Sequence, residues 1–349
     1  MIRIEAEGIA FGFRAETGLL DGFTVTENGR QIAPLHRAPW VDTGEEMPQG
    51  EAPLMERLGG DFFCAPFAAS AEGSPLHGWP ANSPWRVEEA GDGVLQAELE
   101  RQVLGAGLTK RLALQDGHPF VYQSHRFTGG TGRITVANHA NVSVMNGAHI
   151  RTSPKRLWET PQAQQEPDPA RGRSALVSPA QSQDPRAFPG TEGPVDLTRY
   201  PWNPRHEDFV IGIEAPGHAL GWTAVPRPAE GDLFLPLPDP RMLPIALRWH
   251  AIGGRDYPPW SSRHVGCLGV EEGAAEHMLG ISSEADLTGP GALTLGDEVE
   301  VRHVIGATGW PSGEPVARVG LEGDMLAVTG EGGAFRRVPI DAAFLKVGP

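Results

Sequence analysis

Short segments in which apolar and polar residues alternate are the feature of this sequence that most restricts its fold. Residues 2–6 (IRIEA), 108–114 (LTKRLAL) and 120–124 (FVYQS) follow a two-residue period. Neighbouring side chains of a β-strand point to opposite faces, so this period predicts half-buried strands. Between such segments stand dipeptides typical of hairpin turns, namely Asn28-Gly29, Asp92-Gly93 and Asp116-Gly117. Each of these turns predicts a pair of antiparallel neighbours.

Helices find little support in the sequence. No long stretch has the helical period of 3.6 residues, and the chain contains 45 Gly and 33 Pro, which disfavour extended helices. Strands that follow one another without intervening helices favour an antiparallel sandwich over a parallel α/β sheet. We therefore expect an all-β fold, formed by residues 1–349 as a single domain.

A proline-punctuated stretch from about residue 151 to 205 interrupts this pattern and contains no convincing strand. Long loops inside compact domains are often functional or mobile. Two interpretations remain open for it: an excursion over the surface, or a segment that covers a site.

Charge and composition restrict the partners. The formal net charge of −15 would repel a phosphate backbone, so we expect no nucleic-acid partner. No apolar run approaches the roughly 20 residues needed to cross a bilayer, so we expect no membrane partner. Charged Arg3, Glu5 and Glu7 stand where a secretory signal would be apolar, and two cysteines are too few for a disulfide framework. These features predict a cytoplasmic protein. We expect it to be a monomer or a homodimer.

A first candidate segment surrounds His77. Pro75 to Trp85 (PLHGWPANSPW) places this histidine in a Pro/Gly-rich turn near Trp79, Asn82 and Trp85. Tryptophan rings beside a histidine can contact a flat, hydroxylated ligand. The alternative is a core histidine packed between core tryptophans.

A second segment is the β-branched run 134–144, which is interrupted by Asn138, His139 and Asn141. Burying such groups without partners costs on the order of 1–3 kcal/mol each. A strand that carries three of them faces water, a polar network or a ligand.

A third segment, residues 263–273, is an apolar strand that ends in Glu271 and Glu272. Adjacent side chains of a strand point to opposite faces, so only one of these carboxylates can face a given site. We expect the other to lie on the solvated surface. The alternative is that both merely form the charged end of the strand.

Metal and phosphate motifs are absent from the sequence. None of the 12 histidines forms a pair at HExxH spacing, and Cys64 and Cys267 form no closed ligand set with them. The GGTG run at 129–132 lacks the following helix and the lysine of a phosphate loop. We therefore expect neither a metal nor a cofactor.

In order and spacing, the three segments resemble the aldose 1-epimerase (galactose mutarotase) family. His77-Gly78 followed by Trp85 is similar to its His-Gly-x-x-Arg-x-x-x-Trp element, and Asn138-His139 to its Asn-His-x-Tyr-Phe-Asn segment. The strand that ends at Glu271 is similar to its apolar strand ending in Leu-Glu-Pro. The resemblance implies a galactose mutarotase-like antiparallel β-supersandwich and a cofactor-free reaction at the anomeric carbon of a sugar.

The same resemblance implies the site residues. It makes His139 the general acid, Glu271 the general base and His77 an assisting or substrate-binding histidine. Further substrate contacts are expected from Asn82, Trp79, Asn138 and Glu272. The sequence departs from the family at 64–70 (CAPFAAS), where an Asn-Arg pair is usual, so a sugar-binding arginine must come from elsewhere or be missing.

Three functions remain. The first is an epimerase that opens and closes a sugar ring by paired proton transfers. The second is a catalytically silent sugar-binding or regulatory protein of the same fold, which the missing Asn-Arg pair at 64–70 favours. The third, a glycoside hydrolase or lyase, is favoured least, because it would use two carboxylates and the sequence offers no second acid in a matching strand. In each case the partner is a small carbohydrate.

Overall fold

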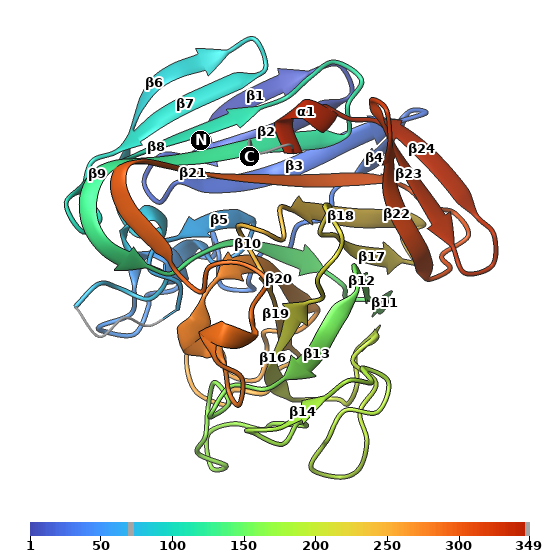
Figure 1. The fold of residues 1–349 in the computed structure, drawn as a ribbon. Helices are drawn as coiled ribbons and strands as arrows, with labels where there is room; N and C mark the ends of the chain where they lie inside the picture. The colour runs from blue at the N-terminus through green and yellow to red at the C-terminus, as the bar shows by residue number, and fades with distance from the viewer. Residues whose placement is uncertain (69–72, 346–349) are drawn as a thin grey trace.

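Two large antiparallel sheets stack face to face and form most of the molecule (Figure 1). The computed structural model describes residues 1–68 and 73–345. Within these ranges the single α-helix, α1, spans only Ala342–Leu345. The predicted all-β, antiparallel architecture is confirmed.

The first sheet has eleven strands in the order β1-β2-β3-β5-β10-β20-β19-β16-β13-β14, with β4 paired to β3. Their bounds are β1 (Ile2–Ala6), β2 (Ile9–Arg14), β3 (Leu19–Glu27), β4 (Arg30–Ile32), β5 (Asp61–Cys64), β10 (Val136–Ser143), β13 (Lys155–Glu159), β14 (Gln181–Ser182), β16 (Glu207–Glu214), β19 (Ile245–Ala251) and β20 (Cys267–Ala274).

The second sheet has eight strands in the order β12-β17-β18-β21-β9-β8-β7-β6. Their bounds are β6 (Trp85–Gly91), β7 (Val94–Leu99), β8 (Ala106–Ala113), β9 (Phe120–Ile134), β12 (Arg151–Thr152), β17 (Thr223–Arg227), β18 (Asp232–Pro238) and β21 (Leu293–Gly309). Smaller sheets join β11 (Ala148–His149) to β15 (Arg199–Tyr200), and β22 (Val316–Glu322) to β23 (Met325–Gly330) and β24 (Phe335–Pro339). Four 3-10 turns complete the elements of the described residues: η1 (Pro53–Arg57), η2 (Trp79–Ala81), η3 (Glu276–Met278) and η4 (Glu284–Asp286).

Two of the predicted hairpin turns have the backbone that their dipeptides favour. Asn28-Gly29 joins β3 to β4 and Asp92-Gly93 joins β6 to β7, and all four residues have positive φ. This is the conformation that a two-residue turn needs to match the strand twist. Asp116-Gly117 lies in the longer connection between β8 and β9.

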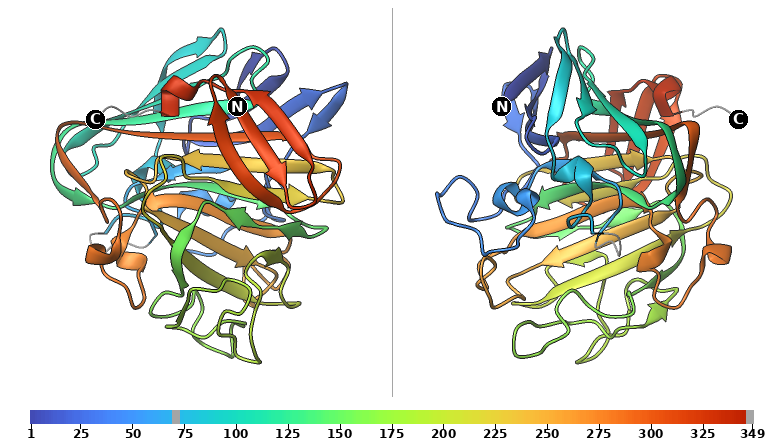
Figure 2. Two further views of the ribbon diagram at one scale, coloured as in Figure 1. Left: turned by 45° about the vertical axis from the view of Figure 1, so that its right-hand side comes forward. Right: turned by 90° about the vertical axis from the view of Figure 1, so that its left-hand side faces the viewer.

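The first sheet buries both of its faces. Its inner face packs on the second sheet through an apolar core that includes Phe63, Val142 and Val270. Its other face, which we call the outer face, carries a separate apolar cluster with Trp249 and Trp260. Loops cover the outer face. Both views in Figure 2 show these loops gathered beside the first sheet, in the lower half of the picture.

The stretch predicted to lack strands begins later than expected. Lys155–Glu159 forms β13, which pairs with β16 inside the first sheet. Flanking Pro154 and Pro161 mask this short strand in the sequence because proline is typical of turns and strand ends. From 160 to 205 only the two-residue strands β14 and β15 occur, and this segment forms the loops at the bottom of Figure 1.

No helix in residues 1–68 and 73–345 has the length and apolar character needed to cross a membrane.

Candidate functional site

His77, His139 and Glu271 meet on the outer face of the first sheet. His139 on β10 lies directly opposite Glu271 on β20, and its Nε2 is 3.2 Å from Oε1 of the carboxyl. This close contact does not have the geometry of a hydrogen bond, and neither Glu271 oxygen has a hydrogen-bond partner within the described residues. The His77 ring stands perpendicular to that of His139, with 5.1 Å between ring centroids. The structure thus brings together three side chains that lie far apart in the sequence.

A tight turn holds His77 in this position. His77 and Gly78 both have positive φ, and a Cβ on Gly78 would lie 2.1 Å from the carbonyl oxygen of Ala65. Only glycine permits so close an approach. The Asn82 side chain braces the turn, because its amide donates to the carbonyls of Leu76 and Gly78 at 2.7 Å.

Burial decides the protonation of the three groups. It raises the pKa of the Glu271 carboxyl to about 8, against the opposing effect of the Arg248 guanidinium. Burial lowers the pKa of His77 to about 3. Burial, helped by neighbouring His77, also lowers the pKa of His139 well below its usual range. At neutral pH the carboxyl is therefore protonated and both imidazoles are neutral, so each can exchange a proton with a ligand.

The three side chains line a small cavity with a volume of about 70 Å³. Much of its wall is apolar, and its other lining residues are Met55, Leu58, Phe67, Ala68, Leu76, Gln165, Phe209, Trp249, Arg255, Trp260 and Met278. A monosaccharide needs more room than this, since ligand sites usually offer roughly 300–1,000 Å³. Met55 and Met278 border it with flexible, unbranched side chains.

Arg255 is a lining residue that the sequence did not single out. Its guanidinium lies 3.6 Å from the Trp260 ring centroid and pairs with the Glu207 carboxylate. Glu207 also accepts a hydrogen bond from Trp249 Nε1 at 2.6 Å. The available signal is Gly253-Gly254 just before the arginine, because a Cβ on Gly254 would lie 2.2 Å from the Glu207 nitrogen. That glycine lets the loop approach β16 closely enough to carry Arg255 to the cavity.

Gly269 is a second feature that the sequence did not single out. A Cβ there would lie 2.5 Å from Glu271 Oε1 and 2.9 Å from the Cβ of Trp249. Two residues before Glu271 on the same strand face, this glycine leaves the space in which the carboxyl and His139 meet.

Glu272 and Asn138 lie on the inner face, away from the cavity. Glu272 is buried and accepts hydrogen bonds from Arg248 at 3.0 Å and Thr223 at 2.8 Å. Asn138 is buried on the same face, with no hydrogen-bond partner for its amide group in the described residues. The expectation that one of the two glutamates is solvated was wrong, because the second sheet covers this face as well.

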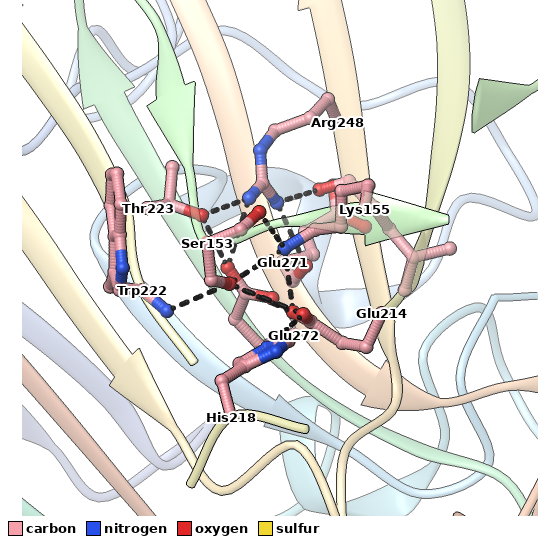
Figure 3. A network of polar contacts seen from close by, with 10 residues as sticks. Ser153, Lys155, Glu214, His218, Trp222, Thr223, Arg248, Glu271 and Glu272 are labelled. Carbon is pink, nitrogen blue, oxygen red and sulfur yellow. Dashed lines mark hydrogen bonds and ion pairs between the residues drawn. The ribbon is translucent and has the colours of Figure 1, made fainter. Parts of the chain in front are cut away.

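Figure 3 shows the polar network around Glu272, which connects the two sheets. Next to the Arg248–Glu272 pair, Lys155 Nζ lies 2.6 Å from a Glu214 oxygen, and His218 contacts the other oxygen at 2.8 Å. Each charged side chain of this buried network thus has a partner of opposite charge, which offsets the cost of removing the charges from water.

The remaining predicted substrate contacts do not line the cavity. Trp79 lies in η2 and stacks under Arg101, whose guanidinium carbon is 4.4 Å from the ring centroid. Trp85 is part of the inter-sheet core. Asn82 uses its side chain on the backbone of the His77 turn and of Leu54.

No family model and no curated protein matches this sequence. Solved structures do match its fold. A candidate aldose 1-epimerase from Escherichia coli K12 is 11% identical, with a TM-score of 0.54 over 88% of this chain and 98% of that protein. A galactose mutarotase-like protein from Lactobacillus casei is 12% identical, with a TM-score of 0.53 over 88% of this chain and 100% of that one. A galactose mutarotase related enzyme from Lactobacillus acidophilus is 12% identical, with a TM-score of 0.52 over 88% and 97% of the two chains. At such identities the likeness shows the architecture: this chain has the galactose mutarotase-like β-sandwich fold.

Proposed function

We propose that the chain is an aldose 1-epimerase-like enzyme that interconverts the anomers of a sugar. The observation that supports this most is the meeting of His77, His139 and Glu271 in one cavity, from a turn and two neighbouring strands. The fold shared with mutarotase-like proteins adds support. No step of this reaction needs a cofactor.

The chemistry requires one group that accepts the proton of the anomeric hydroxyl and another that donates a proton to the ring oxygen. Glu271 and His139 share one transferable proton between them, so one of the two side chains can donate a proton while the other accepts one. With the pKa of Glu271 raised to about 8 and that of His139 lowered, the carboxyl is the donor and the imidazole the acceptor during ring opening. The family resemblance implies the reverse starting roles. Ring closure exchanges the two roles, so either order completes the cycle.

Arg255 lines the cavity and is our candidate for the sugar-binding arginine that is missing at 64–70. Ala69 and Ser70 of that segment lie outside the described residues. The Arg255 guanidinium can donate to sugar hydroxyls while Glu207 holds it in place. Trp260 can stack on a sugar C–H face. His77, with a neutral ring, can hydrogen-bond a ring substituent.

A second candidate function is sugar binding without catalysis. The small, mainly apolar cavity favours it. The two functions differ in one measurement, because a silent binder binds sugars without accelerating their mutarotation.

Polarimetry of freshly dissolved α-aldoses tests the proposal, with His139→Asn as the decisive variant. Asparagine keeps a hydrogen-bonding group in the same space, so we expect an unchanged fold and a turnover lowered by roughly 10²-fold or more. Thermal melts of both proteins serve as the control. A destabilised but active His139→Asn protein would remove this residue from the mechanism. Binding without acceleration by the wild type would establish the silent binder instead.

A further inference from the structure

A second cluster of potential ligand side chains lies on the outer face of the first sheet, beyond Trp249. It consists of His36, His264 and Cys267, whose donor atoms all lie within 4.8 Å of one another. Cys267 begins β20 and points to the same face as Glu271, four residues further on. The Trp249 ring separates the cluster from the candidate site, because it contacts His264 at 5.1 Å and His139 at 6.2 Å between centroids.

The two histidines have unused hydrogen-bonding capacity. His264 is 1% exposed, and neither of its ring nitrogens has a hydrogen-bond partner in the described residues. Nε2 of His36 is also without one there. Buried nitrogens that lack partners are costly, and a bound ion would remove this cost. Of the three residues, His36 is the one that is only partly buried.

The cysteine supplies the chemistry that selects an ion. Its Sγ lies 3.6 Å from Asn141 Oδ1, and the thiol is free and buried. Thiolate and imidazole together suit thiophilic ions such as Cu⁺ and Zn²⁺ and disfavour Mg²⁺ or Ca²⁺. At Zn–N and Zn–S distances of about 2.0–2.3 Å, bound ligand atoms stand roughly 3.3–3.6 Å apart. The present separations therefore need to shrink by about an ångström, which side-chain rotation can provide.

We propose that His36, His264 and Cys267 bind one thiophilic d¹⁰ metal ion, with Cu⁺ matched best. Binding replaces the thiol proton, which leaves to solvent, while the oxidation state of the ion does not change. One Cu⁺, one thiolate and two neutral imidazoles carry no net charge, whereas Zn²⁺ leaves one positive charge in a buried site. The ion would tie two separate segments of the chain, the one around His36 and the one from His264 to Cys267, together beside the Trp249 wall of the cavity.

Metal titration of the reduced, chelator-treated protein tests the proposal. Cu⁺ is added anaerobically against a chromophoric Cu⁺ chelator, and Zn²⁺ is added in a parallel experiment. We expect one Cu⁺ per chain and a higher melting temperature in its presence, because the three ligands are brought together only in the folded state. Stoichiometric Zn²⁺ binding with no Cu⁺ preference would contradict the charge argument. No stoichiometric binding of either ion would overturn the proposal.

Variants locate the site. Cys267→Ser and His36→Gln should each abolish stoichiometric binding, and partly exposed His36 provides the test that disturbs the core least. Cys64→Ser is the matched control, since Cys64 is the other buried cysteine and lies 3.4 Å from His77 rather than in this cluster. It should bind Cu⁺ as the wild type does. Binding that survives in His36→Gln, or that disappears in Cys64→Ser, would place the ion elsewhere and overturn the assignment.

Discussion

Glu271 occupies surroundings that keep its carboxyl protonated at neutral pH. Both of its oxygens are buried, and neither has a hydrogen-bond partner within residues 1–68 and 73–345. The nearest titratable contact is the His139 imidazole, at 3.2 Å. A protonated carboxyl beside a neutral imidazole is the kind of pair found in active sites, where the surroundings drive the pKa values of two titratable groups apart.

This protonation predicts how activity depends on pH. Because the pKa of Glu271 is raised to about 8, its acid form is lost as pH rises through that value. If the carboxyl donates the first proton, kcat/KM should be level between pH 6 and 7 and fall about tenfold per pH unit above 8. Polarimetric rates corrected for buffer-catalysed mutarotation measure this. An activity that rises through pH 8 would instead make Glu271 the base.

The residue types of the site were largely readable from the sequence, whereas their orientations were not. His77, His139 and Glu271 stood out as titratable groups at polar breaks in β segments, and the structure brings them together. Asn138 is adjacent to His139, so strand alternation alone already argued that it faces the opposite side. Arg255 could not be found by pattern, because its position depends on how a loop folds back over β16.

Strand β20 places two carboxylates in two different layers of the molecule. Glu271 lines the cavity. Glu272 points between the sheets, where it meets Arg248 (Figure 3). The Arg248 guanidinium also donates a hydrogen bond to the backbone carbonyl of Glu271 at 3.1 Å, so it contacts the backbone of β20 as well as the Glu272 side chain. The strand therefore joins the candidate site to the buried network that connects the sheets.

Substituting each glutamate separately should affect different properties. Glu271→Gln removes the transferable proton and should abolish activity with little effect on folding. Glu272→Gln leaves the Arg248 charge buried without its counter-ion, so it should cost on the order of 3 kcal/mol of unfolding free energy while the folded protein stays active. Urea unfolding and polarimetry on both variants measure the two effects. Loss of activity in folded Glu272→Gln would shift the catalytic assignment by one residue.

The elements themselves were predictable where local signals dominate. Alternation and the turns at Asn28-Gly29 and Asp92-Gly93 indicated the hairpins correctly. Strand β13 was missed because five residues between prolines carry too short a pattern, and its pairing with β16 comes from tertiary contacts. The order of strands across each sheet depends on long-range pairing, which local periodicity does not encode.

At the scale of the whole molecule, burial strongly lowers the pKa values of seven histidines among the described residues. Burial lowers the pKa of His36 to about 4 and of His77 and His303 to about 3. Burial also lowers the pKa values of four others well below their usual range: His125, His139, His250 and His264. These histidines come from both sheets and from the loops on the outer face. Protonating them would therefore destabilise the packing of both sheets and of these loops.

These histidines predict that the protein loses stability in mild acid. Their folded pKa values lie below the unfolded value near 6.5, so between about pH 6.5 and 4 the unfolded chain binds more protons and the unfolding free energy falls as pH falls. Glu271, with its raised pKa, acts in the opposite sense and contributes stability that is lost as pH rises from about 4.5 to 8. Because the histidines outnumber such carboxyls, we expect a net uptake of several protons on unfolding near pH 5.5, each worth about 1.4 kcal/mol per pH unit.

Urea unfolding at a series of pH values measures that uptake as a slope, and His303→Gln isolates one contribution. Neither ring nitrogen of His303 has a hydrogen-bond partner in the described residues, so the variant loses a titrating group without breaking a hydrogen bond seen there. Its slope should be shallower by about one proton, or roughly 1.4 kcal/mol per pH unit, whatever its stability at pH 7. A slope equal to that of the wild type would mean that His303 is protonated in the folded protein. A stability that is level from pH 7 to 5 would contradict the burial of neutral histidines in the sandwich as a whole.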